Sequence, residues 1–198
     1  MFIPLTGLMV PVSMEPYRLL SIDPDTDTLG VSILSYDFVN KQINLEFAYT
    51  MNASKDSKRY KLACDVHGNR YGRLHSLQEA LTDLMFNFNI HGVVSECPYM
   101  GRFPQAFAAL TECLSCIRAA IVNYDPLLML HEIDPSTVKM HVGVNGKSGD
   151  KDLMFAAIDN LLSSGRIRNN GNLNHRLLDQ HAIDAIAVGY GHMRNLFS

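Results

Sequence analysis

The stretch Tyr17-Arg-Leu-Leu-Ser-Ile-Asp23-Pro24 has the pattern of a buried β-strand that ends abruptly. Its apolar run is as short as strands usually are. Proline has no N–H to donate to a neighbouring strand, so Pro24 is expected to end this one. Asp23 is therefore predicted to lie at the C-terminal end of a strand.

Two further strands are predicted directly after the first. Residues 29–36 and 42–50 are apolar runs, joined by the turn-like segment Asp37-Phe-Val-Asn-Lys41. Every second residue from Ile43 to Phe47 is apolar, as in a strand with one buried face. We expect the three strands to form an antiparallel meander.

The rest of the chain alternates between predicted helices and strands. The spacing of apolar residues predicts helices over 75–89, 103–121 and 150–162, and a short helix is expected from Pro135. Strands are predicted over 92–96 and 127–133. The Asn/Gly-rich segment 169–174 is interpreted as a linker to a last helix. This order predicts an α/β fold in one domain over 1–198, a mixed five-stranded sheet flanked by helices. The same order of elements occurs in the RNase H-like fold.

Length and composition also favour one globular domain. The chain has 198 residues, of which 47% are hydrophobic and 19% charged. The apolar N-terminal arm, residues 1–16, has prolines and no basic region, so it is not interpreted as a signal peptide. No apolar run is long enough to span a membrane. We expect a soluble, intracellular protein with no membrane partner, in a bacterial or phage-infected cytoplasm rather than an organelle.

The four cysteines are too few and too irregularly spaced for a disulfide framework. Cys64-x-x-His67 and Cys113-x-x-Cys116 resemble pairs of zinc ligands. The second pair, however, belongs to a stripe of small residues in a predicted helix. Close helix packing explains that pair equally well, and the stripe around Ala109 and Cys116 is also a candidate dimer interface.

Basic residues are clustered in a chain whose net charge is only −3. Residues 51–74, a predicted long connection, contain six basic and two acidic side chains. The basic residues of this connection are Lys55, Lys58, Arg59, Lys61, Arg70 and Arg73. A second, smaller cluster consists of Lys139, Lys147 and Lys151, and a third of Arg166, Arg168 and Arg176. A solvated surface explains each cluster alone, but together they suit a protein with one phosphate-facing side.

Two polar residues interrupt the apolar pattern of the C-terminal helix, in His181-Ala-Ile-Asp184. Positions three apart face nearly the same side of a helix, so both side chains are expected together on the buried side. Buried polar groups need partners. A hydrogen-bond network would satisfy them, and so would a metal ion.

Glu96 ends a predicted strand as Asp23 does. If the two strands are parallel neighbours, about 4.8 Å apart, the carboxylates lie side by side and repel one another. A divalent cation relieves that repulsion. With His181 and Asp184 added from the last helix, the donors suit magnesium or manganese and in-line displacement at a phosphodiester.

Four segments also carry a resemblance to a known family. They are Leu20-Ser-Ile-Asp23-Pro24, Glu96-Cys-Pro-Tyr99, the run from Lys139 to Gly146 followed by Lys151, and His181-x-x-Asp184-Ala-Ile-Ala-Val-x-x-x-His192. In their order and approximate spacing, over residues 17–192, the chain resembles the RuvC-type Holliday junction resolvases.

The resemblance implies a homodimeric, magnesium-dependent endonuclease with an RNase H-like fold, which nicks symmetrically related strands of a four-way DNA junction. The family's four catalytic positions, which bind one or two magnesium ions or manganese in their place, match Asp23, Glu96, His181 and Asp184. Its positions for DNA contact match Tyr99, which would stack on bases, and Lys139 and Lys151, with Lys147 competing for the last role. Arg70 and Arg73 of the basic connection are added as candidates for DNA contact.

Two departures from the family pattern stand out. Asp25 replaces the glycine that usually follows Ile-Asp-Pro. The first fifteen residues and the basic connection are not part of the common pattern. Both features indicate a divergent member.

Two nucleotide-binding folds fit the sequence poorly. Gly143-Val-Asn-Gly-Lys-Ser148 lacks the glycine spacing of a P-loop, and a sugar-kinase-like ATPase would need two domains of this kind. A nuclease of the same fold that cuts other branched DNA or RNA–DNA hybrids stays open. So does a junction-binding protein that does not cleave, although all four candidate ligands are present.

Overall fold

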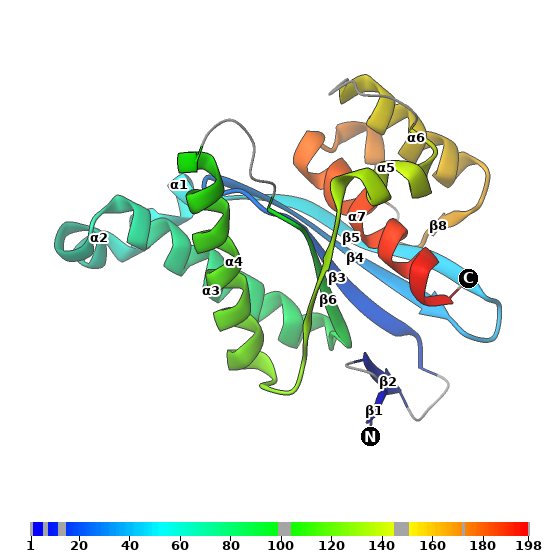
Figure 1. Cartoon of the computed structure of the whole chain (residues 1–198), viewed down its shortest axis with the longest axis horizontal. Coiled ribbons are helices and arrows are strands. Elements are labelled where there is room, and N and C mark those ends of the chain that lie inside the picture. Colours follow the sequence, from blue (N-terminus) through cyan, green and yellow to red (C-terminus); the bar gives the residue numbers. More distant parts are fainter. Residues whose placement is uncertain are drawn as a thin grey trace.

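The computed structural model describes residues 2–5, 8–11, 15–98, 104–144, 151–171 and 173–197. A six-stranded mixed sheet lies at its centre, in the order β7-β6-β3-β4-β5-β8, with helices on both faces (Figure 1). Its strands are β3 (Tyr17–Asp23), β4 (Thr28–Asp37), β5 (Gln42–Asn52), β6 (Gly92–Glu96), β7 (Leu130–Ile133) and β8 (Ile167–Asn169). A separate antiparallel hairpin pairs β1 (Phe2–Leu5) with β2 (Leu8–Pro11) near the N-terminus.

The predicted meander is confirmed, because β4 pairs antiparallel with both β3 and β5. The predicted parallel pairing of β3 with β6 is confirmed as well. Strand β8 was missed, and its three residues were assigned in part to a linker. It lies parallel to β5, and the N–H groups of Asn170 and Gly171 just beyond it both donate to the Leu45 carbonyl. The sheet therefore has six strands and not five.

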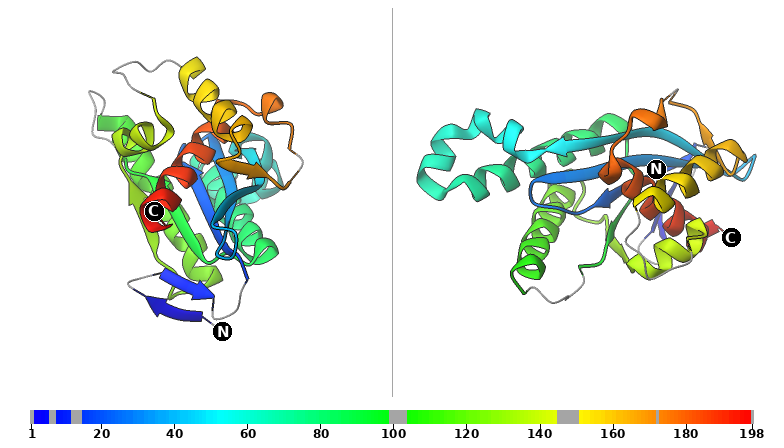
Figure 2. Two further views of the ribbon diagram at one scale, coloured as in Figure 1. Left: turned by 90° about the vertical axis from the view of Figure 1, so that its right-hand side faces the viewer. Right: turned by 90° about the horizontal axis from the view of Figure 1, so that it is seen from above.

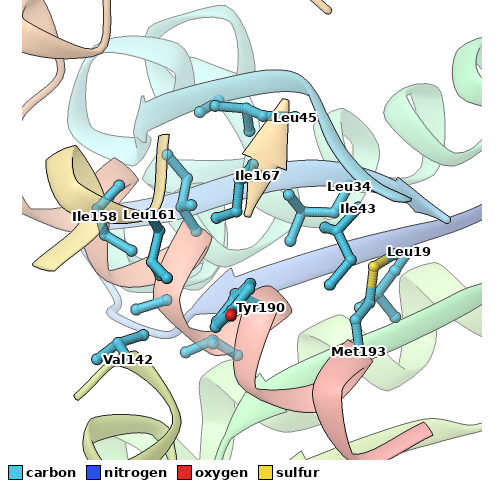
Figure 3. Packing of buried hydrophobic residues seen from close by; sticks show 14 of the residues in the cluster. Leu19, Leu34, Ile43, Leu45, Val142, Ile158, Leu161, Ile167, Tyr190 and Met193 are labelled. Carbon is cyan, nitrogen blue, oxygen red and sulfur yellow. The ribbon is translucent and has the colours of Figure 1, made fainter. Parts of the chain in front are cut away.

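Two groups of helices cover the sheet. On one face lie α3 (Asn69–Phe88) and α4 (Pro104–Tyr124), and on the other lie α5 (Pro135–Val142), α6 (Lys151–Ser163) and α7 (Gln180–Phe197), with the short η2 (His175–Leu177) leading into α7 (Figure 1). Each face has its own buried apolar cluster. Figure 3 shows the second, in which Leu19 and Leu34 of the sheet pack with Met193 of α7.

The alternation of side chains along β3 decides which way Asp23 points. Leu20 and Ile22 belong to the apolar cluster under α3 and α4, whereas Leu19 belongs to the cluster under α7. Side chains of a strand point to alternate faces, so Asp23 shares the face of Leu19. By the same rule, Glu96 of β6 shares the face of Val94, which also lies under α7. Both carboxylates are thus directed to the α7 side.

The predicted long connection is helical. It contains α1 (Ala53–Asp56), the short η1 (Ser57–Tyr60) and α2 (Lys61–His67), and α3 begins at Asn69, six residues before the predicted start. Figure 2 (right) shows this cyan segment projecting away from the sheet and its covering helices. Because it buries no residue of α2, its apolar pattern gave no helical signal.

The stripe of small residues on α4 packs inside the chain. Cys113 and Cys116 are buried, and their thiols donate to the backbone carbonyls of Asp25 and Leu74. This part of the proposed dimer face is therefore already covered, and the cysteine pair serves helix packing. Of the helices described, α4 alone is long and apolar enough to cross a membrane by length and composition, and one of its faces is buried in the chain.

Candidate active site

The two strand-end carboxylates lie side by side. The register pairs Ile22 of β3 with Ser95 of β6, so the next residue on each strand, Asp23 and Glu96, end the parallel pair together. Both side chains are largely buried, and Asp23 lies against His181 of α7. This arrangement is the one predicted from the sequence.

His181 bridges the first turn of α7 to the sheet. Its Nδ1 lies 3.0 Å from Asp23 Oδ2, and its Nε2 lies 3.0 Å from the Thr28 hydroxyl. The Thr28 hydroxyl also lies 3.4 Å from Asp25 Oδ2. The ring is therefore held at both nitrogens, by the Asp23 carboxylate at the end of β3 and by the Thr28 hydroxyl at the start of β4.

Asp184 lies one helical turn after His181 and faces the same cluster. One of its oxygens accepts a hydrogen bond of 2.8 Å from the Gln180 amide. Its negative charge raises the pKa of both Asp23 and Glu96. The structure thus brings the four predicted residues together from β3, β6 and α7.

The electrostatics of the cluster favour uptake of a positive charge. Burial raises the pKa of Asp23 to about 6, with smaller contributions from Asp184 and Asp25, against the lowering effect of the hydrogen bond from His181. Burial, together with the charges of Asp23 and Asp184, raises the pKa of Glu96 to about 7. Crowded carboxylates with raised pKa values are typical of functional sites, because a proton or a cation relieves their repulsion.

Solved structures of similar fold exist, although the sequence itself matches no family model. A comparison with curated proteins found no match either. Among solved structures, Thermus thermophilus RuvC in complex with a Holliday junction substrate has a TM-score of 0.63 at 15% identity, over 89% of this chain and 92% of that one. The yeast mitochondrial Holliday junction resolvase Ydc2 has a TM-score of 0.64 at 15% identity, over 92% and 80%. The fowlpox virus Holliday junction resolvase has a TM-score of 0.55 at 14% identity, over 90% and 99%.

The chain has the fold of the RuvC-type Holliday junction resolvases. At 14–15% identity the likeness is one of fold, and it extends from the four short segments to between 89% and 92% of the chain. The basic segment 53–73, which is outside the family pattern, forms the projecting helices α1 to α2 and the start of α3 in this resolvase fold.

The residues predicted for DNA contact are placed unevenly. Lys139 on α5 lies close enough to Glu96 to lower its pKa. Tyr99 and Lys147 lie outside the described residues, and Lys151 is placed only as the first residue of α6. Among the described residues predicted to contact phosphate, Lys139 is therefore the one whose charge acts on the carboxylate cluster.

Arg70 and Arg73 pair with carboxylates of the same chain. Arg70 Nε lies 2.7 Å from Glu112 Oε2 of α4, and Arg73 pairs with Asp27 in the β3–β4 connection. Arg166, from the third basic cluster, lines a hollow of about 640 Å³ with Lys41 at the opposite end of the strands from Asp23. Arg166 of the third cluster thus lies at the other end of the strands from Arg73 of the first cluster.

Thr28 was missed in the sequence. It lies in the spacing Asp23-x-Asp25-x-x-Thr28, five residues after Asp23. Its hydroxyl fixes the second nitrogen of His181. Nothing in the sequence connects residues 28 and 181, so only the packing of α7 on β4 reveals this partner.

The donor set fits a hard divalent cation. Three crowded carboxylates, two of them with raised pKa values, supply the oxygen ligands that magnesium and manganese prefer. Within the described part of the chain, no three Asp, Glu, His or Cys side chains are already arranged to coordinate one ion. His181 and Asp184 are instead hydrogen bonded to neighbouring side chains, so coordination would require these to turn toward the ion.

Gly30 allows α7 to approach the sheet at the cluster. It is paired with Asp23 across β3 and β4, and a Cβ on it would lie 2.0 Å from the His181 carbonyl oxygen. We expect Gly30→Ala to push away the first turn of α7, at a cost of about 1–3 kcal/mol in unfolding free energy, as overpacking does. Thermal unfolding measures the loss.

Gly191→Ala is the matched control for this prediction. Its added Cβ would meet nothing closer than 3.5 Å, and alanine favours a helix over glycine by up to about 1 kcal/mol. Gly191→Ala should therefore be neutral or stabilising. Equal melting temperatures for the wild type and Gly30→Ala would contradict the close approach at His181.

Proposed function

We propose that the protein is a magnesium-dependent endonuclease that resolves four-way DNA junctions by paired nicks. The observation that carries the proposal is the convergence of Asp23, Glu96 and Asp184 at the ends of two parallel strands in a resolvase fold. The solved resolvases of this fold include one bound to a Holliday junction substrate. Manganese is expected to replace magnesium.

The reaction proposed is hydrolysis of a phosphodiester. The oxygen of water forms a bond to phosphorus while one phosphorus–oxygen ester bond breaks, leaving one phosphate end and one hydroxyl end. One or two divalent ions, held by Asp23, Glu96, Asp184 and His181, would supply an activated water and neutralise charge on the leaving oxygen.

The chain's own side chains have separate roles in this proposal. Lys139 lies beside Glu96 and is placed to attract the phosphate to be cut. Thr28 and Asp23 fix the two nitrogens of His181, which holds the ring against the carboxylates. The raised pKa of Glu96 places its loss of a proton near neutral pH, so ligand binding there competes with protons.

The decisive test is a cleavage assay with a set of substrates. A mobile four-way junction, a flap, a Y-structure, an RNA–DNA hybrid and a linear duplex are compared in magnesium at equal concentrations. Preferential, paired nicking of the four-way junction supports the proposal. Equal cutting of the other substrates would favour a nuclease of broader specificity, and junction binding without any cutting would favour a binding protein.

Paired nicking requires two active sites on one junction, so we propose a homodimer. Sedimentation of the protein alone and on the junction measures this state. A protein that stays monomeric at high concentration and on the junction would remove the paired-nick model.

A further inference from the structure

The segment 53–73, called here the basic arm, has a charge opposite to that of the rest of the chain. It contains six basic and two acidic residues, a balance of +4 in a chain whose net charge is −3. The remaining residues therefore carry −7. The arm projects from the end of the sheet (Figure 2, right), so its positive charge stands apart from the acidic remainder.

The root of the arm is attached beside the candidate active site. The Ala53 N–H donates to the Asp27 carbonyl over 2.9 Å, and the Ser54 hydroxyl donates to an Asp27 carboxylate oxygen over 3.2 Å. Asp27 lies four residues after Asp23, in the connection that also carries Thr28. The arm therefore leaves the sheet at the same end of the strands at which the carboxylates lie.

Arg70 and Arg73 differ from the lysines of the arm in their surroundings. Arg73 pairs with Asp27, and Arg70 pairs with Glu112, so both fasten the arm to the body. Lys55, Lys58 and Lys61 are exposed, and no described carboxylate lies within ion-pair distance of them. Their charge is thus available to something outside the chain.

Two of these lysines line a hollow. It has a volume of about 570 Å³, and it is lined by Ser54, Lys58, Lys61, Cys64, Asp65, Asn69 and Arg73. Lys58 and Lys61 contribute two cations and Asn69 an amide beside one acid, Asp65, whereas Arg73 and Ser54 are already bonded to Asp27. The two lysines and the amide suit an anionic group that accepts hydrogen bonds. A phosphate of a nucleic-acid backbone has that chemistry.

The exposed apolar side chains of the arm are too few to favour a protein partner. Leu62 and Val66 are 82% and 71% exposed on α2, but they stand among lysines. A specific protein interface buries about 800 Å² on each partner and is depleted of lysine. A polyanion matches the arm better than an apolar surface does.

We propose that the basic arm grips duplex DNA next to the cleavage site, with Lys55, Lys58 and Lys61 contacting backbone phosphates. Arg70 and Arg73 act as positioning residues that hold the arm in place. The inference rests on the proposed function, because it takes the DNA bound at the carboxylates as the DNA that the arm holds. It adds a second region of contact, specific to the inserted helices.

The test compares two charge-matched double variants of the full chain. Lys58→Gln with Lys61→Gln removes two charges from the arm, and Lys41→Gln with Arg166→Gln removes two at the opposite end of the strands. Binding to a fluorescent four-way junction and to a linear duplex is measured without metal, from 50 to 200 mM salt. Circular dichroism confirms that both variants are folded.

We expect the arm variant to bind both DNAs roughly tenfold more weakly at 100 mM salt. The slope of log affinity against log salt should fall by about 1.8, since each phosphate contact contributes about 0.9. The control variant should keep its affinity within about twofold. Unchanged affinity and slope in the arm variant would overturn the proposal.

The outcomes separate this inference from the proposed function. If the wild type nicks junctions and the arm variant binds DNA with unchanged affinity, only the proposal of DNA contact by the arm is overturned. A wild type that nicks no branched DNA, together with an arm variant that has lost affinity, supports the arm and refutes the nuclease. A wild type that binds no DNA overturns both.

Discussion

Asp23→Asn and Asp184→Asn are each expected to abolish nicking of a four-way junction while leaving junction binding intact. Each replacement removes one negative charge from the cluster but keeps the shape of the side chain. The new amide oxygen of Asn at position 23 can still accept from His181, and that at position 184 from Gln180. Loss of a metal ligand removes several kcal/mol of transition-state stabilisation, which lowers the rate by ~1,000-fold or more.

Single-turnover cleavage in magnesium measures the rate, and binding without metal measures the affinity, which should change by less than about threefold. Asp25→Asn is the matched control from the same connection. Asp25 Oδ1 accepts from the Asp27 N–H and Oδ2 accepts from the Thr28 hydroxyl, so an asparagine keeps the first bond and places its NH₂ group beside the Thr28 oxygen. We expect Asp25→Asn to cut within tenfold of the wild type, and cutting at wild-type rates by Asp23→Asn or Asp184→Asn would refute the mechanism.

The carboxylate pair could be predicted because strand geometry alone places it. Pro24 marks the end of one strand and Glu96 the end of another. Because the two strands are parallel neighbours, their last residues lie at the same end of the sheet. The spacing of His181 and Asp184 added a helix face that needed partners. Each of these inferences depends on local pattern and a single assumption about strand order.

Other features depend on tertiary contacts that no local pattern encodes. Strand β8 has three residues and exists because it pairs with β5. The arm helices bury nothing in α2, so they lack the apolar periodicity by which helices are found. The bond from Thr28 to His181 joins residues 153 positions apart. These were missed for the same physical reason, which is that long-range packing creates them.

The crowding of the carboxylates also predicts a cost in stability. Burial and the neighbouring charges raise the pKa of Glu96 from 4.5 to about 7, so the folded protein holds this proton more tightly than the unfolded chain does. Stability from this group is fully present below pH 4.5. It is lost as the pH rises through about 7, because there the folded state binds more protons than the unfolded state. A shift of this size corresponds to ~3 kcal/mol.

Glu96→Gln is therefore expected to raise the unfolding free energy of the metal-free protein at pH 8 by roughly 1–3 kcal/mol. At pH 4, where Glu96 is protonated in both states, the variant and the wild type should be nearly equal in stability. Thermal unfolding in EDTA at the two pH values measures the difference. Glu46→Gln is a suitable control, because the Glu46 side chain accepts from Ser35 and is outside the cluster.

Magnesium should reverse the ranking of the two proteins at pH 8. A cation that binds only the folded state stabilises it in proportion to the logarithm of its concentration over its dissociation constant. The wild type, with Glu96 charged, should gain melting temperature with added magnesium, whereas Glu96→Gln should gain little. A wild type as stable as the variant at pH 8 in EDTA, and unaffected by magnesium, would contradict the crowding of charge on which the proposed metal site depends.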